Sequence, residues 1–572
     1  MRRLARSVLG MATATLAVLA CTTPAGPASA ADAAYDVLVF SKTAGFRHDS
    51  IAVGTQTIRD LGAANNFTVT ATEDSATFTT ANLGRYEAVV FLNTTGDVLN
   101  ATQEAAFESY IRAGGGYVGV HSAADTEYGW SFYGDLVGAY FASHPAIQQA
   151  NVKVENRAHA ATAHLPQTWT RTDEWYNYQT NARSSARVLA TLDESSYSGG
   201  GMGADHPHVW CKSYAGGRSF YTGGGHTQAS YAEPAFRSHL LGGIRYAAGR
   251  TKADCRPETG YTTLYNGSTS GWSQAGPGSF SNSDATLTSV GGMGLFWHSA
   301  KQFTSYSLKL DWKMPGDDNS GIFIGFPPSS DPWSAVNNGY EIQIDATDAA
   351  DRTTGAVYTF KSADIAARDA ALNPPGEWNT YELLVEGERL QIFLNGVKIN
   401  DFTNTDPVRS LAGHIGIQNH GTGDDVAFRN VRIKELGGTQ PPPTGGTGPI
   451  KGLAGKCLDV RSSGTADGTQ IQLYGCNGTA AQTWAVTSGS TVKALGKCLD
   501  VSGGGSADGT KIQLWSCNGS GAQNWAAQAD GTVRNPQSGK CLDVSGNNSA
   551  DGTPVHLWTC VGGAANQKWI LP

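Results

Sequence analysis

The sequence has no block of basic residues after its first few positions, and only 16% of its 572 residues are charged. The formal net charge is −8, with 41 basic against 49 acidic residues. Because nucleic-acid binding depends on clustered Lys and Arg, this balance argues against a nucleic-acid partner. After the first 30 residues, no segment is apolar over the length needed to cross a bilayer, so we expect no membrane span.

The nine cysteines lack the CxxC spacing of zinc ribbons and redox motifs. Apart from Cys21 in the leader they are even in number, which suits disulfide bonding in an oxidising compartment. A bridge between Cys211 and Cys255 is the simplest expectation, with two buried thiols as the alternative. The other six form three pairs, each 19 residues apart: Cys457 and Cys476, Cys498 and Cys517, and Cys541 and Cys560.

Residues 1–30 have the features of an export signal. Three arginines in the first six residues precede an apolar run from Met11 to Ala20, and Ala28-Ser29-Ala30 offers small residues before a cleavage point. We therefore expect a secreted, extracellular protein. Lipid attachment at Cys21 is the alternative, although the residue two places before it, Leu19, is bulkier than a typical lipobox allows.

Two composition breaks divide the chain. At about 100–200 residues per domain, its length calls for several domains. A Pro/Gly/Thr-rich linker is expected at 437–448, and a polar stretch near 251–260 separates alternating strands and helices from short strands and turns. We therefore expect domains at 34–250, 260–436 and 449–572.

The last of these domains contains a three-fold internal repeat. Gly-Lys-Cys-Leu-Asp-Val begins at Gly455, Gly496 and Gly539, and each copy continues through an Ala-Asp-Gly-Thr turn to a Gln-x-Trp motif. A unit of about 40 residues cannot bury a face alone, so three copies are expected to close a barrel. The compound motif resembles that of the ricin-type β-trefoil lectins over the whole segment.

This resemblance implies a polysaccharide or oligosaccharide partner. A carboxylate would accept hydrogen bonds from sugar hydroxyls, and an aromatic ring would cover the apolar face of the pyranose. The Gln-x-Trp tryptophans are expected in the core, and the glutamines have holding the fold as an alternative role. Ala481 and Ala522 replace an asparagine of the family pattern, for which Asn477 and Asn518 are candidate substitutes. The implied sugar-binding residues are Asp459, Gln472, Tyr474 and Gln482; Asp500, Gln513, Trp515 and Gln523; and Asp543, Trp558, Asn566 and Gln567.

Residues 260–436 alternate apolar and polar positions with frequent turn signals, which predicts an antiparallel sandwich. Period two places Glu341, Gln343 and Asp345 on one strand face and their apolar neighbours on the other. Polar groups gathered on one sheet face indicate either a ligand groove or a solvated face.

The motifs of this segment resemble the 3-keto-disaccharide hydrolases, which implies a concanavalin-like jelly roll. They include Asn319-Ser-Gly-Ile-Phe, Gly339-Tyr-Glu-Ile-Gln and Gly376-Glu-Trp-Asn. The family cleaves glycosides whose sugar carries a ketone at C3, and a divalent metal is a candidate cofactor. The sequence departs from many relatives by having Gly325 where they carry Arg. The resemblance implies Glu341 and His420 as base or metal ligands, with Asp345, Gln343 and Asn319 orienting the substrate.

In residues 34–250, apolar strands alternate with helical segments, which predicts a doubly wound parallel sheet with ligands at the carboxyl ends of strands. The motifs GFRHDSI (45–51), GVHSAADTEY (119–128), DEWYN (173–177) and YTGGGHT (221–227) resemble the ThuA-like, trehalose-utilisation family. This implies a fold related to class I glutamine amidotransferases and flavodoxin. The comparable turn has His121 and no thiol, so amidotransfer is not expected, and no G-x-S-x-G elbow is present. The candidate metal or acid–base site is His48, His121, Asp125, Glu174 and His226, with purely structural histidines as the alternative.

Two functions follow from the sequence. The first is a secreted enzyme that cleaves 3-keto-glycosides or related sugars and is targeted to polysaccharide by its lectin domain. The second is a non-catalytic carbohydrate-binding adhesin or sensor with inactive upstream domains. The sequence leaves the sugar, the cofactor and the oligomeric state open.

Overall fold

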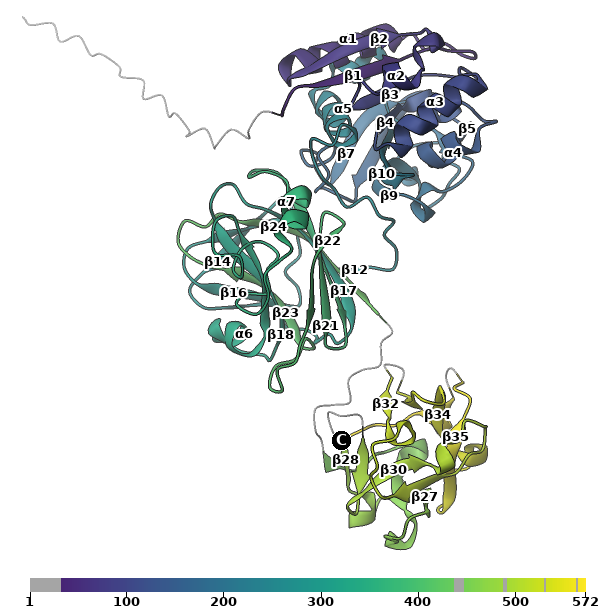
Figure 1. Cartoon of the computed structure of the whole chain (residues 1–572), viewed down its shortest axis with the longest axis vertical. Helices are drawn as coiled ribbons and strands as arrows, with labels where there is room; N and C mark the ends of the chain where they lie inside the picture. The colour runs from purple at the N-terminus through teal and green to yellow at the C-terminus, as the bar shows by residue number, and fades with distance from the viewer. Residues whose placement is uncertain (1–31, 437–446, 487–490, 529–530, 562–563) are drawn as a thin grey trace, which may run out of the picture.

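The computed structural model describes residues 32–436, 447–486, 491–528, 531–561 and 564–572. The export signal expected at 1–30 and most of the linker expected at 437–448 lie outside the described residues. Figure 1 shows three units in chain order: a mixed α/β unit, a two-sheet unit and a small all-β unit. Among the described residues, no helix combines the length and apolarity that a bilayer crossing requires.

The α/β unit is built on a nine-stranded sheet in the order β2-β1-β3-β4-β11-β10-β9-β6-β7. The strands from β2 to β11 run parallel, and the others are antiparallel. Since successive strand residues point to opposite faces, Val37 and Leu38 pack into different cores, one beneath α1 and α5 and the other beneath α3 and α4. This is the doubly wound fold expected from the sequence, except that the sheet is mixed, because the pairings from β11 through β7 are antiparallel.

The main sheet of this unit consists of β1 (Tyr35–Phe40), β2 (Phe67–Thr72), β3 (Ala88–Leu92), β4 (Gly116–Val120), β6 (Gln148–Val154), β7 (Thr168–Asp173), β9 (Arg187–Leu192), β10 (Pro207–Tyr214) and β11 (Gly217–Thr222). A small second sheet pairs β5 (Phe141–Ser143) with β8 (Asn177–Tyr178). The helices are α1 (Ile51–Ala64), α2 (Thr80–Leu83), α3 (Ala101–Arg112), α4 (Ser131–Val137) and α5 (Pro234–Ala247).

The second unit is the expected β-sandwich. One sheet has the order β14-β15-β24-β17-β20-β21-β22 with β12 beside β24, and the other has the order β13-β16-β23-β18-β19. Leu308 of β17 and Ile342 of β19 belong to one core between the sheets, so the polar residues of β19 lie on the face away from that core. Asn395 and Gly396, both with positive φ, form the two-residue turn between β21 and β22.

The strands of the sandwich are β12 (Thr262–Tyr265), β13 (Trp272–Ala275), β14 (Ser279–Ser283), β15 (Thr286–Val290), β16 (Gly294–His298), β17 (Tyr306–Lys313), β18 (Asn319–Phe326), β19 (Tyr340–Asp345), β20 (Asn379–Glu386), β21 (Arg389–Leu394), β22 (Val397–Thr403), β23 (His414–Asn419) and β24 (Ala427–Glu435). Two short helices accompany them, α6 (Trp333–Asn338) and α7 (Ile365–Ala371).

Buried charges and a disulfide join the first two units. Cys211 of β10 is bonded to Cys255 with a Cα–Cα distance of 5.4 Å, which ties the connecting segment to the sheet. Glu258 in that segment is 2.6 Å from Arg187 of β9 and 2.6 Å from Arg432 of β24. Arginine and glutamate side chains here are 6–7% exposed, so breaking this group would leave uncompensated buried charge.

The third unit is a β-trefoil-like barrel with a core that includes Trp484, Trp525 and Trp569 from the three Gln-x-Trp motifs. Each repeat carries one disulfide, with Cα–Cα distances of 5.0–5.2 Å. All four expected cysteine pairs are therefore bonded. The strands are β25 (Thr447–Gly448), β26 (Cys457–Val460), β27 (Thr469–Tyr474), β28 (Trp484–Val486), β29 (Val492–Ala494), β30 (Lys497–Val501), β31 (Ile512–Trp515), β32 (Ala526–Ala527), β33 (Val533–Asn535), β34 (Lys540–Val544) and β35 (Thr553–Trp558).

Candidate active and carbohydrate-binding sites

The α/β unit brings three histidines and a glutamate together at strand ends. His48 lies in the loop after β1, His121 directly follows β4, Glu174 directly follows β7, and His226 lies in the loop after β11. One ligand atom from each residue lies within 4.8 Å of the others. His121 has a φ of 49°, a left-handed conformation that costs a non-glycine residue of the order of 1–3 kcal/mol.

The cluster is tightly connected. His121 Nε2 lies 3.1 Å from His226 Nδ1 and 3.4 Å from Glu174 Oε2, and His226 Nδ1 lies 3.1 Å from the same oxygen. Burial alone would raise the pKa of Glu174, but its contacts with His121 and His226 hold it well below its usual range. Burial lowers the pKa of His48 to about 3, so this ring is a neutral nitrogen ligand or base at physiological pH.

The structure brings together four of the five residues predicted for this site. Asp125 is not among them, because its carboxylate accepts a hydrogen bond from Tyr128 at 2.6 Å, at the end of the short turn that begins with His121. His144 was not predicted, yet its Nδ1 lies 3.0 Å from Glu174 Oε1. No local pattern distinguishes His144 from the other histidines of this domain, since its partner is distant in sequence.

The sandwich places Glu341 on the polar face of β19, with Gln343 beside it and Gln418 on β23. Glu341 is 6% exposed, and burial raises its pKa to about 8 despite a partly opposing contact with Gln418. One oxygen atom of each of these three side chains has no hydrogen-bond partner within the described parts of the chain. A carboxyl group that exchanges protons near neutrality, flanked by two free acceptors, can serve as an acid or base toward a hydroxyl-rich ligand.

The remaining predicted residues of the sandwich form a chain of contacts. Asn319 donates to Asp345 at 2.8 Å and accepts from Gln343 at 3.3 Å. Its backbone N–H donates to Asp424 at 3.0 Å, and Asp424 lies 3.0 Å from His420. His420 thus joins the site through Asp424. Asp424 was not predicted from the sequence. Among the described residues, the groups of three or more side chains placed to share an ion do not include Glu341.

Gly325, where many relatives carry Arg, occupies a bulge between β18 and β23. Its φ is +73°, and a Cβ atom there would lie 1.9 Å from the carbonyl oxygen of Ser410. The backbone of this chain therefore requires glycine at the position.

Each trefoil repeat centres on a buried aspartate. Asp459 accepts from Gln472 at 2.8 Å and from Gln482 at 3.0 Å. Asp500 accepts from Gln513 and Gln523 at 2.9 and 3.1 Å. The glutamine of each Gln-x-Trp motif also bonds to the neighbouring backbone, so these glutamines fix the loop as well as the carboxylate.

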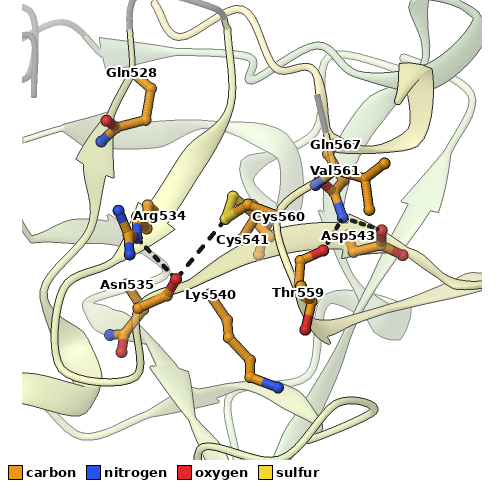
Figure 2. The surroundings of a disulfide bond; sticks show 12 residues. Gln528, Arg534, Asn535, Lys540, Cys541, Asp543, Thr559, Cys560, Val561 and Gln567 are labelled. Atoms are coloured by element: carbon orange, nitrogen blue, oxygen red, sulfur yellow. Dashed lines mark hydrogen bonds between the residues drawn. A yellow bond between two sulfur atoms is a disulfide. The ribbon is translucent and has the colours of Figure 1, made fainter. Parts of the chain in front are cut away.

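The third repeat differs in its partners. Asp543 lies 2.9 Å from His556, and both Asn566 and Gln567 donate to it at 2.8 Å. Figure 2 shows Asp543 close to the disulfide between Cys541 and Cys560. At the three sites the aromatic side chains are 37–40% exposed and free to cover a sugar ring: Tyr474, Trp515 and Trp558.

Neighbouring repeats clamp each other in a cycle. Asp467 of the first repeat bonds to Lys497 and to the amide of Ser516 in the second. In the same way Asp508 bonds to Lys540 and Thr559, and Asp551 bonds to Lys456 and Gly475. Each clamped amide directly follows the exposed aromatic residue, so every ring is positioned by the preceding repeat.

Three consecutive segments match family models. Residues 36–247 match trehalose utilisation (ThuA), residues 260–434 match the 3-keto-alpha-glucoside-1,2-lyase-like domain, and residues 446–569 match the ricin-type beta-trefoil lectin domain. The chain thus combines a ThuA-like, a 3-keto-disaccharide-hydrolase-like and a ricin-type lectin domain, and the last is a carbohydrate-binding type of domain.

Solved structures resemble the separate units. A ThuA-like protein from Bacteroides uniformis is 24% identical over 39% of this chain and 94% of its own length, with a TM-score of 0.34. A protein named as a glycosyl hydrolase from Parabacteroides distasonis is 24% identical over 31% and 94%, with a TM-score of 0.27. The designed three-fold symmetric protein ThreeFoil is 31% identical over 22% and 95%, with a TM-score of 0.20.

Proposed function

We propose that this chain, in which ThuA-like, 3-keto-glucoside-lyase-like and ricin-type lectin domains follow one another, is an exported enzyme that cleaves 3-keto-glycosides or related sugars. The observation that supports the proposal most is Glu341, a buried carboxyl group with a pKa of about 8. Perturbed carboxyl groups of this kind concentrate at catalytic sites. The four disulfides suit an oxidising, extracellular environment.

The proposed reaction is an elimination followed by hydration. A ketone at C3 acidifies the proton on C2, and its removal places negative charge on the ketone oxygen. Expulsion of the C1 substituent breaks the C1–O bond and forms a C1=C2 double bond, and the leaving oxygen takes up a proton. Water then adds across the double bond. Glu341 exchanges the protons, while Gln343, Asn319 and Asp345 orient the sugar through hydrogen bonds.

The spacing of the carboxylates supports elimination over ordinary glycoside hydrolysis. Glu341 and Asp345 lie four residues apart on β19, which corresponds to about 13 Å at ~3.3 Å per residue. Two-carboxylate glycosidases need about 5–9.5 Å between the acid and its partner. Glu341 therefore acts without a second carboxylate from its own strand.

In this proposal the lectin domain holds the enzyme on polysaccharide. Three shallow sites, each with an exposed aromatic ring and a buried aspartate, would bind a repeating polymer with avidity that exceeds the affinity of any single site. Targeting requires at least one working site, and the gain in avidity requires two or more sites on the same barrel to bind one polymer.

A non-catalytic adhesin or sensor is the second candidate, and the low exposure of Glu341 (6%) favours it. Incubation of the purified full chain with 3-keto-trehalose or 3-keto-lactose, with and without chelator, distinguishes the two functions. We expect release of the second sugar by the wild type and none by Glu341→Gln. Intact substrate with the wild type, or full cleavage by Glu341→Gln, would contradict the proposed catalytic role.

A further inference from the structure

We propose that the α/β domain binds a divalent first-row transition metal through His48, His121, Glu174 and His226, and that the metal can expand its coordination to accept a ligand with two adjacent oxygen atoms. This site lies in a different domain from Glu341. The inference is therefore independent of glycoside cleavage by the sandwich.

The three imidazole rings are arranged around a common point. Their centroids form a triangle with sides of 4.9–5.1 Å, and the rings meet at interplanar angles of 77–90°. Rings that packed only for burial would need no convergence of their nitrogen atoms. Here the nitrogen atoms meet a carboxylate, which is the donor set of many zinc, iron and manganese sites.

Hydrogen bonding at His121 indicates which of its nitrogen atoms is available as a ligand. Its Nδ1 lies 2.9 Å from the carbonyl oxygen of Gly223, and since a carbonyl only accepts, Nδ1 carries the proton. In the tautomer with a bare Nε2, the lone pair of that atom is directed toward Glu174 Oε2, 3.4 Å away. A cation shared with His226 Nδ1, which lies 3.1 Å from both atoms, removes the repulsion between the lone pairs. That cation is either a metal ion or a proton, and the cobalt titration below distinguishes the two.

The distances suit a metal ion. Bonds of about 2.0–2.1 Å, as zinc makes to nitrogen and oxygen, place the ligand atoms of a tetrahedron roughly 3.3 Å apart. Here the three pairs among His121, Glu174 and His226 are separated by 3.1, 3.4 and 3.1 Å. Little rearrangement would be needed to admit the ion.

Outer contacts hold the ligands in place, as in known metal sites. Gly223 orients His121, and Ser122 Oγ lies 3.3 Å from His48 Nδ1, which leaves Nε2 of that ring as its ligand atom. His144 contacts the second oxygen of Glu174 at 3.0 Å. The cluster of His159, Cys211 and Cys255 offers no comparable site, because both sulfur atoms are in the disulfide.

The site is open on one side. A cavity of about 490 Å³ reaches His48 and His226, and its lining includes Phe46, Arg47 and Asp49. Phe46 is 67% exposed and offers an apolar surface. Arg47 pairs with Glu73, whereas Asp49 accepts from Gln228 through one oxygen atom and keeps further acceptor capacity for a ligand. A small hydroxy-ketone or sugar can enter such a cavity and present adjacent oxygen atoms to the metal.

Cobalt provides the test, since Co²⁺ reports its coordination through visible absorption. The full chain, stripped with chelator, is titrated with Co²⁺, alongside Glu174→Gln, His226→Gln and the control His164→Gln. His164 is exposed outside the cluster and contacts the carbonyl of Ala235. Circular dichroism verifies folding, and because the side chain of His226 is 18% exposed, more than that of Glu174 (8%), its variant keeps the test informative if Glu174→Gln does not fold. Acetohydroxamate, which binds metals through two adjacent oxygen atoms, is then added.

We expect one Co²⁺ per chain in the wild type and in His164→Gln, displaced by Zn²⁺, with at least tenfold weaker binding in folded Glu174→Gln or His226→Gln. We also expect acetohydroxamate to change the cobalt spectrum. Failure to bind Co²⁺ stoichiometrically would show that a proton is the shared cation and overturn the proposal. Co²⁺ binding that is unaffected by both variants would overturn the proposed ligand set. A cobalt spectrum that acetohydroxamate does not change would overturn the proposed access of an oxygen ligand to the metal.

Discussion

Replacing Glu341 with glutamine should stabilise the sandwich while abolishing its proposed activity. Burial raises the pKa of Glu341 from 4.5 to about 8, so the folded state prefers the neutral carboxyl group. Below pH 4.5 both the folded and unfolded states carry the proton, and this group costs no stability. As pH rises to 8 the unfolded state ionises first, and stability is lost across that interval.

The magnitude follows from the same two pKa values. At 1.36 kcal/mol per pKa unit, the full cost above pH 8 is about 5 kcal/mol, with about 3 kcal/mol at pH 7 and about 1 kcal/mol at pH 5. Glutamine is neutral in both states and has nearly the same shape. The stability gain of Glu341→Gln over the wild type should therefore grow with pH by these amounts.

Differential scanning calorimetry of the full chain from about pH 5 to pH 9 measures this gain as the displacement of the transition that responds to the substitution. Glu386→Gln is the matched control, because Glu386 lies on β20 of the same sandwich and is exposed. It should shift the transition little at any pH. A gain from Glu341→Gln that stays constant over this range would show that Glu341 ionises normally, and would refute both the pKa argument and the proposed acid–base role.

Three further predictions concern other parts of the chain. Asp508→Ala removes the acceptor of the Thr559 amide; we expect faster hydrogen exchange there and weaker polysaccharide binding, and unchanged exchange would contradict the clamp. Replacing Cys211 and Cys255 together with serine opens a disulfide of sequence separation 44 and should lower the free energy of unfolding by about 4 kcal/mol; a drop below about 1 kcal/mol in urea denaturation would argue against it. Glu258→Gln removes the carboxylate beside buried Arg187 and leaves Arg432 with Asp311, and should cost about 3–5 kcal/mol, seen as separate calorimetric transitions of the first two domains; one unchanged transition would contradict this role.

The features that could be predicted from the sequence are those that depend on residues near each other in the chain or on a motif that recurs. Three copies of one motif fixed the disulfide pairs and the trefoil, and alternation along β19 placed Glu341 and Gln343 on one face. His48, His121 and His226 each follow the carboxyl end of a strand. Because a doubly wound sheet gathers these ends at one edge, their position in the sequence predicted that the three side chains lie close together.

What the sequence did not predict depends on contacts between distant segments. His144 and Asp424 orient candidate site residues, yet nothing in their neighbourhoods distinguishes them from solvated surface residues. Asp125 was grouped with His121 because it is near in sequence, but the short turn between them directs it to Tyr128. The ion pairs of Glu258 with two domains likewise require the packed structure.

The cyclic clamp of the trefoil has a consequence for how its sites can change. Since Asp467, Asp508 and Asp551 each hold the loop of the next repeat, no repeat forms its candidate sugar-binding site alone. Duplicating or grafting a single repeat would transfer its exposed aromatic residue without the aspartate of the preceding repeat that holds the adjacent amide. New specificity is therefore more accessible through substitution of Tyr474, Trp515 or Trp558 in place than through exchange of whole repeats.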